Sequence, residues 1–300
     1  MQRHIVFQAY GNDSNLQECL FALLSFSATH PAGIPDTLIH IYTDRQEWFT
    51  AQQIGFPIRY HRLDAARLKD WRGSINFVHR VKIALLQDLV SQVNGAVLYL
   101  DSDICFLQPL DNMLQRIAAG ERFMHIAEGR LMDEPNPVIR KLNRFLRSHP
   151  YVDRNGRDNT ISQETEMWNA GVLGFTSDQK ALLADVLDFT DEIYPPYPKH
   201  VVEQFAFSYF MSRAGHIHSA SAVILHYWNF KEFRQYLDAF TAYIQGRSWP
   251  EKVRLSAMLP ISALLQEKLS FYMNRSLLKK LAGEHYQPRI PDWKMKEREL

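Results

Sequence analysis

The chain has 300 residues, of which 46% are hydrophobic and 22% charged, and its formal net charge is +1. This composition is ordinary for a globular protein with one large or two modest domains, and the small net charge excludes a global field that recruits nucleic acid or membrane. Two cysteines, Cys19 and Cys105, are too few and too far apart for a disulfide framework or a cysteine zinc site, which favours a reducing compartment.

The first hundred residues alternate strand-like and helix-like patterns. Three short apolar runs predict strands: residues 5–11, 38–43 and about 57–61. Helices are expected from Asp13 or Ser14 to a point before Pro31, and again from about Gln46. This alternation predicts a βαβ layout with a parallel sheet. No signal peptide precedes the first run and no apolar stretch approaches the roughly 20 residues of a membrane span, so we expect a cytoplasmic protein.

A helix is expected from Val78 to Val93, and it contains a lysine in an unusual place. Its apolar residues recur at steps of three and four and form one stripe: Val78, Val81, Leu85, Leu89 and Val93. Lys82 falls in the middle of that stripe. A lysine on a buried stripe either extends to solvent along its own stem or meets an anion. Both interpretations stay open from this helix alone.

The next strand ends in two carboxylates. Residues 96–100 are apolar without a break and run into Asp101-Ser102-Asp103. An unbroken apolar run suits a strand that is covered on both faces, and ligands bind beyond the carboxyl ends of strands in open parallel sheets. Residues i and i+2 of an extended chain point to the same side, so both carboxylates could bind one cation. The alternative is a turn whose carboxylates accept backbone N–H bonds.

The second half of the chain has a weakly patterned segment and a long helical end. Residues 129–165 contain prolines and a basic face that, taken alone, is typical of a solvated helix. Further elements are expected in this order: a helix over 111–119, a strand over 123–127, a glycine-bearing strand over 168–175, helices over 178–193 and 201–214, a strand over 222–228 that delivers His226, and helices from Lys231 onward.

The last segment, from Arg275, mixes basic residues such as Lys279 and Lys280 with the aromatic side chains of Tyr286 and Trp293. Such a mixture can dock on anionic lipid. Several acidic residues dilute the charge, which favours a solvated packing arm. The sequence therefore leaves two expectations open: an arm that packs on the protein, or peripheral contact with the inner face of a membrane.

Four signals occur in one order: Lys82, Asp101-Ser102-Asp103, Asn169-Ala170-Gly171-Val172, and His226 followed by Lys231. This set resembles the GT-A nucleotide-sugar glycosyltransferases, most closely glycosyltransferase family eight, over roughly residues 4–235. The resemblance implies an α/β GT-A fold: a mostly parallel sheet flanked by helices, forming a catalytic domain over 1–235. Residues 129–165 would be a variable segment on the acceptor side, and 236–300 a helical region.

The resemblance also implies an activity and a role for each matched residue. The activity is metal-dependent transfer of a sugar from a nucleotide diphosphate sugar, a UDP-sugar, to a hydroxyl of a glycan or glycolipid such as lipopolysaccharide, with no nucleic-acid partner. The implied ligands of Mn²⁺ or Mg²⁺ are Asp101, Asp103 and His226. The implied donor contacts are Ala9, Tyr10, Gly11, Lys82, Asp101, Ser102, Asn169, Ala170, Gly171 and Lys231. Glu203 and Gln204 match the catalytic pair, either beside the anomeric carbon of a retaining enzyme or, for Glu203, as the general base of an inverting one.

Three positions depart from the family pattern. Ala9-Tyr10-Gly11-Asn12 lacks the aspartates that read the uracil, Glu203 replaces an aspartate, and the motif around His226 lacks a glycine and brings Lys231 one residue early. Two other functions are alternatives. An aspartyl-nucleophile phosphohydrolase also has a strand followed by Asp-x-Asp, but close to the start of its domain and with a later acidic cluster that is missing here. A nucleotide-sugar-binding protein without activity is the second alternative.

Overall fold

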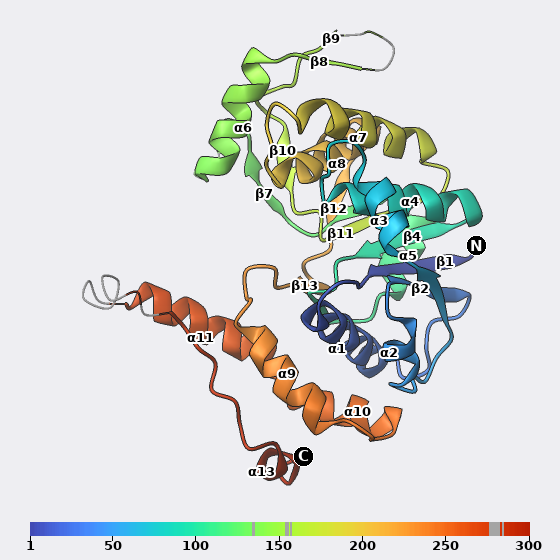
Figure 1. The fold of residues 1–300 in the computed structure, drawn as a ribbon, viewed down its shortest axis with the longest axis vertical. Helices are drawn as coiled ribbons and strands as arrows, with labels where there is room; N and C mark the ends of the chain where they lie inside the picture. Colours follow the sequence, from blue (N-terminus) through green and yellow to red (C-terminus); the bar gives the residue numbers. More distant parts are fainter. Residues whose placement is uncertain (134–135, 154–155, 157, 276–282, 284) are drawn as a thin grey trace.

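A seven-stranded sheet forms the centre of the computed structural model, which describes residues 1–300 except 134–135, 154–155, 157, 276–282 and 284 (Figure 1). The order of its strands is β12-β6-β11-β4-β1-β2-β3. Their bounds are β1 Arg3–Gln8, β2 Thr37–Thr43, β3 Ile58–Arg62, β4 Ala96–Leu100, β6 Arg122–Met124, β11 Val172–Thr176 and β12 Ile217–Ser219. Strands β4, β1, β2 and β3 run parallel, whereas β11 runs antiparallel to both β4 and β6. The prediction of a mostly parallel α/β sheet is confirmed.

Both faces of the sheet are covered, which explains the unbroken apolar runs. Alternate residues of a strand point to opposite faces, so Ile5 and Phe7 of β1 enter one core cluster and Val6 enters the other. Leu98 and Tyr99 of β4 divide in the same way. The helices that pack on the side of Ile5 are α1 (Asp13–Thr29), α2 (Gln46–Thr50), α5 (Asp111–Ala118), α9 (Phe233–Tyr243) and α10 (Trp249–Ser256). Those that pack on the side of Val6 are α4 (Arg80–Gln92), α6 (Pro137–Ser148), α7 (Lys180–Ile193) and α8 (Val201–Ala214).

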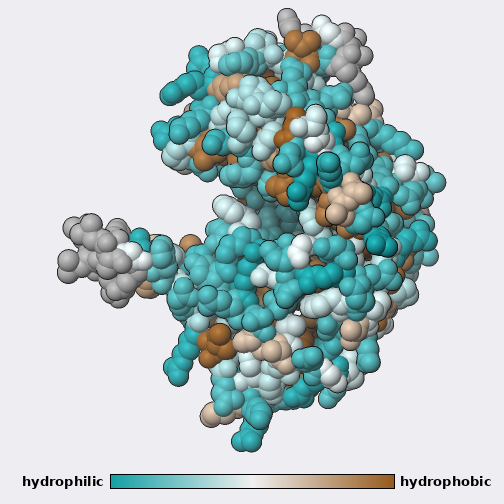
Figure 2. Space-filling model, viewed as in Figure 1, coloured by the Kyte–Doolittle hydropathy of each residue, from teal (hydrophilic) through white to brown (hydrophobic). Residues whose placement is uncertain are grey.

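Smaller elements complete the chain. Three two-stranded sheets pair β5 (Ile104–Phe106) with β13 (Ile224–His226), β7 (Ala127–Arg130) with β10 (Glu166–Trp168), and β8 (Tyr151–Val152) with β9 (Asp158–Asn159). The remaining helices of the described residues are α3 (Ala65–Arg72), α11 (Ile261–Met273) and α13 (Trp293–Glu297). In Figure 1, α11 extends away from the sheet, and Figure 2 shows a recess between the parts of the molecule that carry α8 and α9.

The C-terminal region shares a core with the N-terminal part of the chain. Phe240 of α9 and Leu255 of α10 belong to the same buried cluster as the α1 side of the sheet. Among the described helices, none combines the length and the apolar character that crossing a membrane requires. Lys279 and Lys280 of the expected lipid-docking segment lie outside the described residues. The domain boundary at 235 and the membrane contact stay predictions.

Three local predictions were wrong. Helix α1 is capped by Asn12, not by Asp13 or Ser14: Asn12 Oδ1 accepts a bond of 3.0 Å from the Asn15 backbone N–H. Val78 precedes α4 and is 46% exposed, so the buried stripe of that helix begins at Val81. The strand expected over 168–175 is two strands, β10 and β11, in different sheets. Residues 169–171 connect them and bend the chain past the end of β4.

Three histidines form a hydrogen-bonded row across one face of β1, β2 and β3. His4 Nδ1 lies 3.0 Å from His40 Nε2, and His40 Nδ1 lies 2.9 Å from His61 Nε2. His4 Nε2 is 3.4 Å from the Asn94 carbonyl, which can only accept, so all three rings donate from Nε2, and His4 and His40 accept at Nδ1. His4 and His40 therefore have no free nitrogen for a second proton, and protonating either ring breaks a bond in the row.

This row predicts a loss of stability in acid. Burial, with a smaller contribution from neighbouring positive groups, lowers the pKa of His40 to about 3, and burial lowers the pKa of His4 and His61 as well. The unfolded chain binds these protons near pH 6.5, so the stabilisation is complete above that pH and is lost as the pH falls. His40 alone should account for about 2 kcal/mol of the loss in unfolding free energy between pH 7 and pH 5.

Replacing His40 tests this expectation. His40→Leu should be less stable than the wild type at pH 8, because two histidines lose a partner, yet its urea-unfolding free energy should fall less steeply towards pH 5. His216→Gln, which removes a histidine outside the row, is the control and should keep the wild-type slope. An equally steep fall in His40→Leu would contradict the assignment.

Candidate active site

Asp101, Asp103 and His226 converge at the carboxyl end of β4. One ligand atom from each lies within 4.8 Å of the others. Strand β4 ends at Leu100 and β5 begins at Ile104, so the two aspartates occupy the link between them. Strand β13 pairs with β5 in a register that sets His226 opposite Ile104. As a result His226 Nε2 lies 3.1 Å from Asp103 Oδ1 and 3.8 Å from Asp101 Oδ2.

The set fits a divalent cation. Two carboxylates with one imidazole suit Mn²⁺ or Mg²⁺, and the nitrogen favours Mn²⁺. His226 Nδ1 lies 2.7 Å from Asn169 Oδ1, an acceptor that keeps a proton on Nδ1, so Nε2, which faces the carboxylates, is the nitrogen that would bind a cation. The carboxylate oxygens of Asp101 and Asp103 contact other side chains, among them Tyr99 and Lys231, which favours the cation interpretation over the turn.

Asp103 is held in its ionised form by its neighbours. It is 8% exposed, and burial alone would disfavour its charge. The hydrogen bond and charge of His226 and the ion pair with Lys231, 2.8 Å from Nζ to Oδ2, outweigh burial and hold the pKa of Asp103 well below its usual range. The Lys231 side chain is itself 53% exposed, so this ion pair lies at the surface.

Lys82 is 3% exposed and contacts Asp101, one of the three residues that converge here. Its Nζ is 3.3 Å from Asp101 Oδ1 and 3.1 Å from Glu203 Oε1, and it donates a 3.0 Å bond to the Ala170 carbonyl. Of the two interpretations left open by the sequence, Lys82 meets anions and does not extend to solvent. Its three partners belong to the protein, so contact between Lys82 and a donor remains a prediction.

Glu203 shares this buried ion pair and carries a perturbed carboxyl. Burial raises the pKa of Glu203 to about 7, and the positive charge of Lys82 only partly opposes that rise. For Lys82 the balance is reversed: burial lowers its pKa, but the charges of Asp101 and Glu203 outweigh burial and raise it. Glu203 is 3% exposed, whereas its neighbour Gln204 is half-buried, so Gln204 is the more accessible member of the predicted catalytic pair.

Gly171 is required by the histidine. A Cβ at this position would lie 2.1 Å from His226 Cε1, so any side chain larger than hydrogen would displace the imidazole. The Gly171 carbonyl accepts a 2.9 Å bond from the Asp101 backbone N–H, which ties this segment to the acidic turn. The sequence pattern indicated a close approach at this glycine, and the approaching group is His226. A contact between the donor and Asn169, Ala170 or Gly171 remains a prediction.

Gly171→Ala should therefore disturb the candidate metal site. We expect the affinity for Mn²⁺ to fall about 10- to 100-fold, as for other changes that reorient a ligand, and the unfolding free energy to fall by about 1–3 kcal/mol. Isothermal titration calorimetry with Mn²⁺ measures the first effect and urea unfolding the second.

Gly174→Ala is the matched control in the same segment. Its Cβ would crowd Ile117 Cδ1 at 2.7 Å, an apolar group that does not belong to the acidic set. This variant should lose stability and keep the Mn²⁺ affinity of the wild type. Equal Mn²⁺ affinities in Gly171→Ala, Gly174→Ala and the wild type would refute the assigned role of Gly171.

A polar cavity of ≈ 270 Å³ adjoins the acidic residues. Its lining includes Tyr10 and Ser102, two of the predicted donor contacts. Ala9 lies in the core with no exposed surface, and the Gly11 backbone N–H donates to the Asp44 carboxylate at 3.1 Å. These two positions are outside the cavity lining, and their contact with a donor stays a prediction. Residues that the sequence did not indicate complete the wall: Gln8, Asn15, Glu18, Val78, His79 and Arg234.

Glu18 and Arg234 form a pair in this wall although they lie far apart in the sequence. Arg234 Nε donates to Glu18 Oε1 at 2.8 Å and joins α9 to α1 across the cavity wall. Burial raises the pKa of Glu18, although the bond from Arg234 opposes the rise. In the sequence, the only local sign of this pair is a glutamate among the apolar residues of α1. The sequence does not show which residue it pairs with, so no role could be assigned to Glu18.

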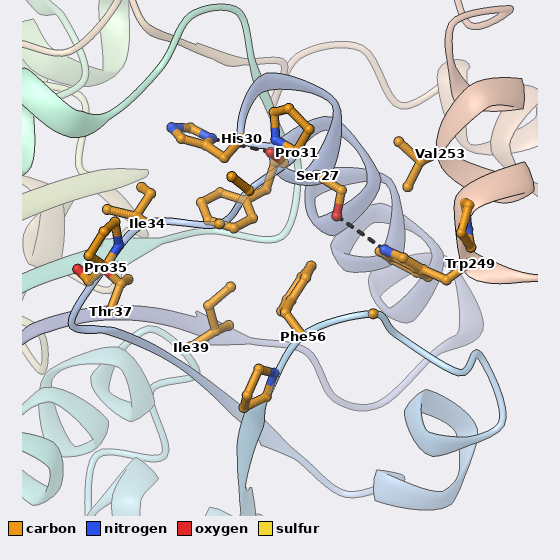
Figure 3. Close-up of a pocket in the computed structure, with 16 residues that line it drawn as sticks. Ser27, His30, Pro31, Ile34, Pro35, Thr37, Ile39, Phe56, Trp249 and Val253 are labelled. Carbon is orange, nitrogen blue, oxygen red and sulfur yellow. Dashed lines mark hydrogen bonds between the residues drawn. The ribbon is translucent and has the colours of Figure 1, made fainter.

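A larger cavity of ≈ 720 Å³ lies at the other end of α1 (Figure 3). Apolar side chains dominate its lining: Phe26, Ile34, Ile39, Phe56, Trp249 and Val253. Figure 3 shows the bond of 3.2 Å from Trp249 Nε1 to Ser27 Oγ that closes one side. No carboxylate, lysine or arginine lines this cavity among the described residues. Charge-bearing chemistry is therefore assigned to the smaller, polar cavity.

Comparison with known proteins gave similarity to solved structures only: no protein-family model and no curated protein matches. Galactosyltransferase LgtC in complex with donor and acceptor sugar analogs is 19% identical (69% of this chain, 70% of that chain, TM-score 0.47). Mouse xyloside xylosyltransferase 1 is 12% identical (73% and 85%, TM-score 0.46), and the apo-form glycosyltransferase GlyE of Streptococcus pneumoniae is 14% identical (85% and 62%, TM-score 0.48). These similar structures are glycosyltransferases, the class that the sequence motifs resemble.

Proposed function

We propose that this chain is a metal-dependent glycosyltransferase that moves a sugar from a nucleotide diphosphate sugar, a UDP-sugar, to a hydroxyl of a glycan or glycolipid acceptor. The observation that carries the proposal is the convergence of Asp101, Asp103 and His226 beside a polar cavity. Breaking the bond between sugar and diphosphate leaves extra negative charge on the diphosphate. A site that gathers positive charge at that point lowers the barrier to the reaction.

In this proposal Asp101, Asp103 and His226 hold Mn²⁺ or Mg²⁺, which supplies positive charge beside the leaving diphosphate. Lys231 adds a second positive charge when its half-exposed side chain leaves Asp103 and meets a phosphate oxygen. Lys82 balances the charges of the half-buried Asp101 and the buried Glu203 and so keeps the acidic set from repelling the donor. Tyr10 and Ser102 line the cavity on the donor side.

The sugar lies next to Gln204 in this proposal. Glu203 is buried against Lys82, a position that supports an electrostatic role and not the abstraction of a proton from an acceptor hydroxyl. Gln204 is a neutral amide and a weak base, which suits stabilisation of a cationic sugar in a retaining transfer. Proton NMR of the product would then show the anomeric configuration of the donor, whereas inversion would assign the reaction a general base.

The acceptor side is proposed to include residues 129–165 and the region 236–300, with the protein acting in the cytoplasm and at the inner face of the membrane. Replacing segment 137–148 should change acceptor use and leave hydrolysis of the donor largely intact. Loss of both activities together would remove this segment from the acceptor side.

A donor screen tests the proposed function. The full chain is incubated with Mn²⁺ and a panel of nucleotide sugars, and release of nucleoside diphosphate is followed by mass spectrometry. We expect release from at least one UDP-sugar, and its loss on addition of a chelator. Hydrolysis of a simple phosphomonoester that Asp101→Asn abolishes would favour a phosphohydrolase instead. Neither turnover nor thermal stabilisation by any donor would contradict the proposal outright.

A further inference from the structure

Glu128 joins the two halves of the candidate site, although no motif singles it out. It lies in β7 opposite β10, where the pairing shifts register between Met167 and Trp168. Glu128 Oε1 accepts a 3.1 Å bond from Asn169 Nδ2, and Oε2 accepts a 2.8 Å bond from Gln204 Nε2. One carboxylate therefore holds the residue that orients His226 and the residue proposed to lie beside the sugar.

The direction of these bonds fixes the orientation of both amides. An ionised carboxylate only accepts hydrogen bonds, so it must face the NH₂ end of Asn169 and the NH₂ end of Gln204. Asn169 Oδ1 then faces the other way, where it accepts from the Gly171 backbone N–H at 3.1 Å and from His226 Nδ1 at 2.7 Å. Gln204 likewise turns its carbonyl oxygen away from Glu128.

The backbone around this network is held in place independently. The Trp168 N–H donates to Ser208 Oγ at 2.9 Å, which anchors β10 to the helix that carries Gln204. The Asn169 N–H donates to the Ile126 carbonyl at 2.9 Å, and this bond keeps Asn169 beside the strand that carries Glu128. The side chains can therefore rotate their amides without a change in the position of the main chain.

We propose that Glu128 is a positioning residue: together with the Gly171 N–H it holds the Asn169 amide that directs His226 Nε2 at the carboxylates, and alone among the described groups it turns the Gln204 amide so that its oxygen faces the sugar. This inference rests on the proposed function for its catalytic part. Its hydrogen-bonding part concerns the protein alone and can be measured without a substrate.

Glu128→Gln distinguishes the effect of Glu128 on the Gln204 amide from its effect on the Asn169 amide. The new side chain offers one oxygen and one NH₂ group to two NH₂ groups, so one amide must turn round. Asn169 is also held by the Gly171 N–H, and the Gln204 side chain has no such second bond among those described, so Gln204 should turn. We expect kcat for nucleoside diphosphate release to fall at least about 10-fold, with the Mn²⁺ Kd and the melting temperature close to wild type.

The double variant Glu128→Gln with Gln204→Glu restores an oxygen on the sugar side. Its new carboxylate at position 204 accepts a bond from the NH₂ group introduced at position 128 and keeps its second oxygen free. This variant should regain most of the lost kcat.

NMR of the metal-free protein tests directly the hydrogen bonds that Glu128 accepts from Asn169 and Gln204. ¹⁵N spectra should show His226 protonated on Nδ1 in the wild type and in Glu128→Gln, and a shifted Gln204 side-chain NH₂ signal only in the variant. Glu164→Gln removes an exposed charge that pairs with Arg130 and is the control, with wild-type kcat and spectra expected.

Each outcome decides the inference. An unchanged kcat and an unchanged Gln204 NH₂ signal in Glu128→Gln would overturn it. A fall in kcat without recovery in the double variant would mean that Glu128 does not act through the Gln204 amide and would also overturn it. If the wild type releases no nucleoside diphosphate, the proposed function fails, and the NMR measurements still test the role of Glu128.

Discussion

Asp103→Asn is expected to lower Mn²⁺-dependent release of nucleoside diphosphate by about 100- to 1,000-fold, the usual cost of removing one group that stabilises developing charge. The substitution keeps the shape of the side chain and removes the negative charge that binds Lys231 and faces His226. Two effects then combine: the cation loses a ligand, and Lys231 loses its anchor. Steady-state kinetics over a range of Mn²⁺ concentrations should show that excess metal does not restore the wild-type rate.

The fold of this variant should remain intact, since the half-exposed Lys231 can be solvated once Asp103 is neutral. Circular dichroism and urea unfolding check that point. Asp133→Asn is the control: it neutralises an exposed carboxylate that pairs with Arg130 away from the acidic set, and it should leave the rate unchanged. A wild-type rate in Asp103→Asn would remove the proposed metal role from this residue.

Lys82→Met is expected to produce a large loss of stability, about 3–5 kcal/mol of unfolding free energy at pH 8. Lys82 and Glu203 are both buried, so the variant leaves two carboxylates, Asp101 and Glu203, facing each other without a cation between them. Lowering the pH towards 6 should reduce the deficit, because the pKa of Glu203 is already raised and its carboxyl then takes up a proton. Urea unfolding at both pH values measures the change.

Lys252→Met is a matched control for burial. Lys252 is 2% exposed, but among the described residues its Nζ contacts only neutral oxygens, the carbonyl and the side-chain oxygen of Gln52, each at 3.0 Å. Replacing Lys252 leaves no unpaired charge, so Lys252→Met should lose clearly less unfolding free energy than Lys82→Met. Adding Glu203→Gln to Lys82→Met should recover part of the stability. Equal costs for the two lysines, or no recovery, would mean that charge balance is not what Lys82 provides.

Much of the sheet, and the acidic residues and the histidine that come together at its edge, could be predicted from the sequence because they depend on local patterns. The unbroken apolar run before Asp101 reflects a strand that is buried on both faces, and the spacing of Asp101 and Asp103 already places both carboxylates on one side. Lys82 stood out because a charged residue interrupts an apolar stripe. His226 follows a short apolar strand, and its convergence with the aspartates depends on the pairing of β13 with β5.

Other features depend on long-range contacts that one sequence does not contain. A largely apolar strand such as β11 reads alike in either direction, so its antiparallel pairing with β4 was not visible. Glu128 lies just before the weakly patterned segment, 76 residues before Gln204, and nothing local marks it. The structure also explains why residue 171 is a glycine. The sequence pattern indicates only that some group comes close to this position, and the structure places the His226 ring there.

Direct measurement of Mn²⁺ binding tests the central claim most closely. The full chain is titrated with Mn²⁺ and free ion is followed by electron paramagnetic resonance, with and without UDP, for the wild type and for His226→Ala. We expect one Mn²⁺ per chain in the wild type, tighter binding when UDP is present, and loss of that site in the variant. Binding that is absent in the wild type, or identical in wild type and His226→Ala, would contradict the claim that these residues form a metal–diphosphate site.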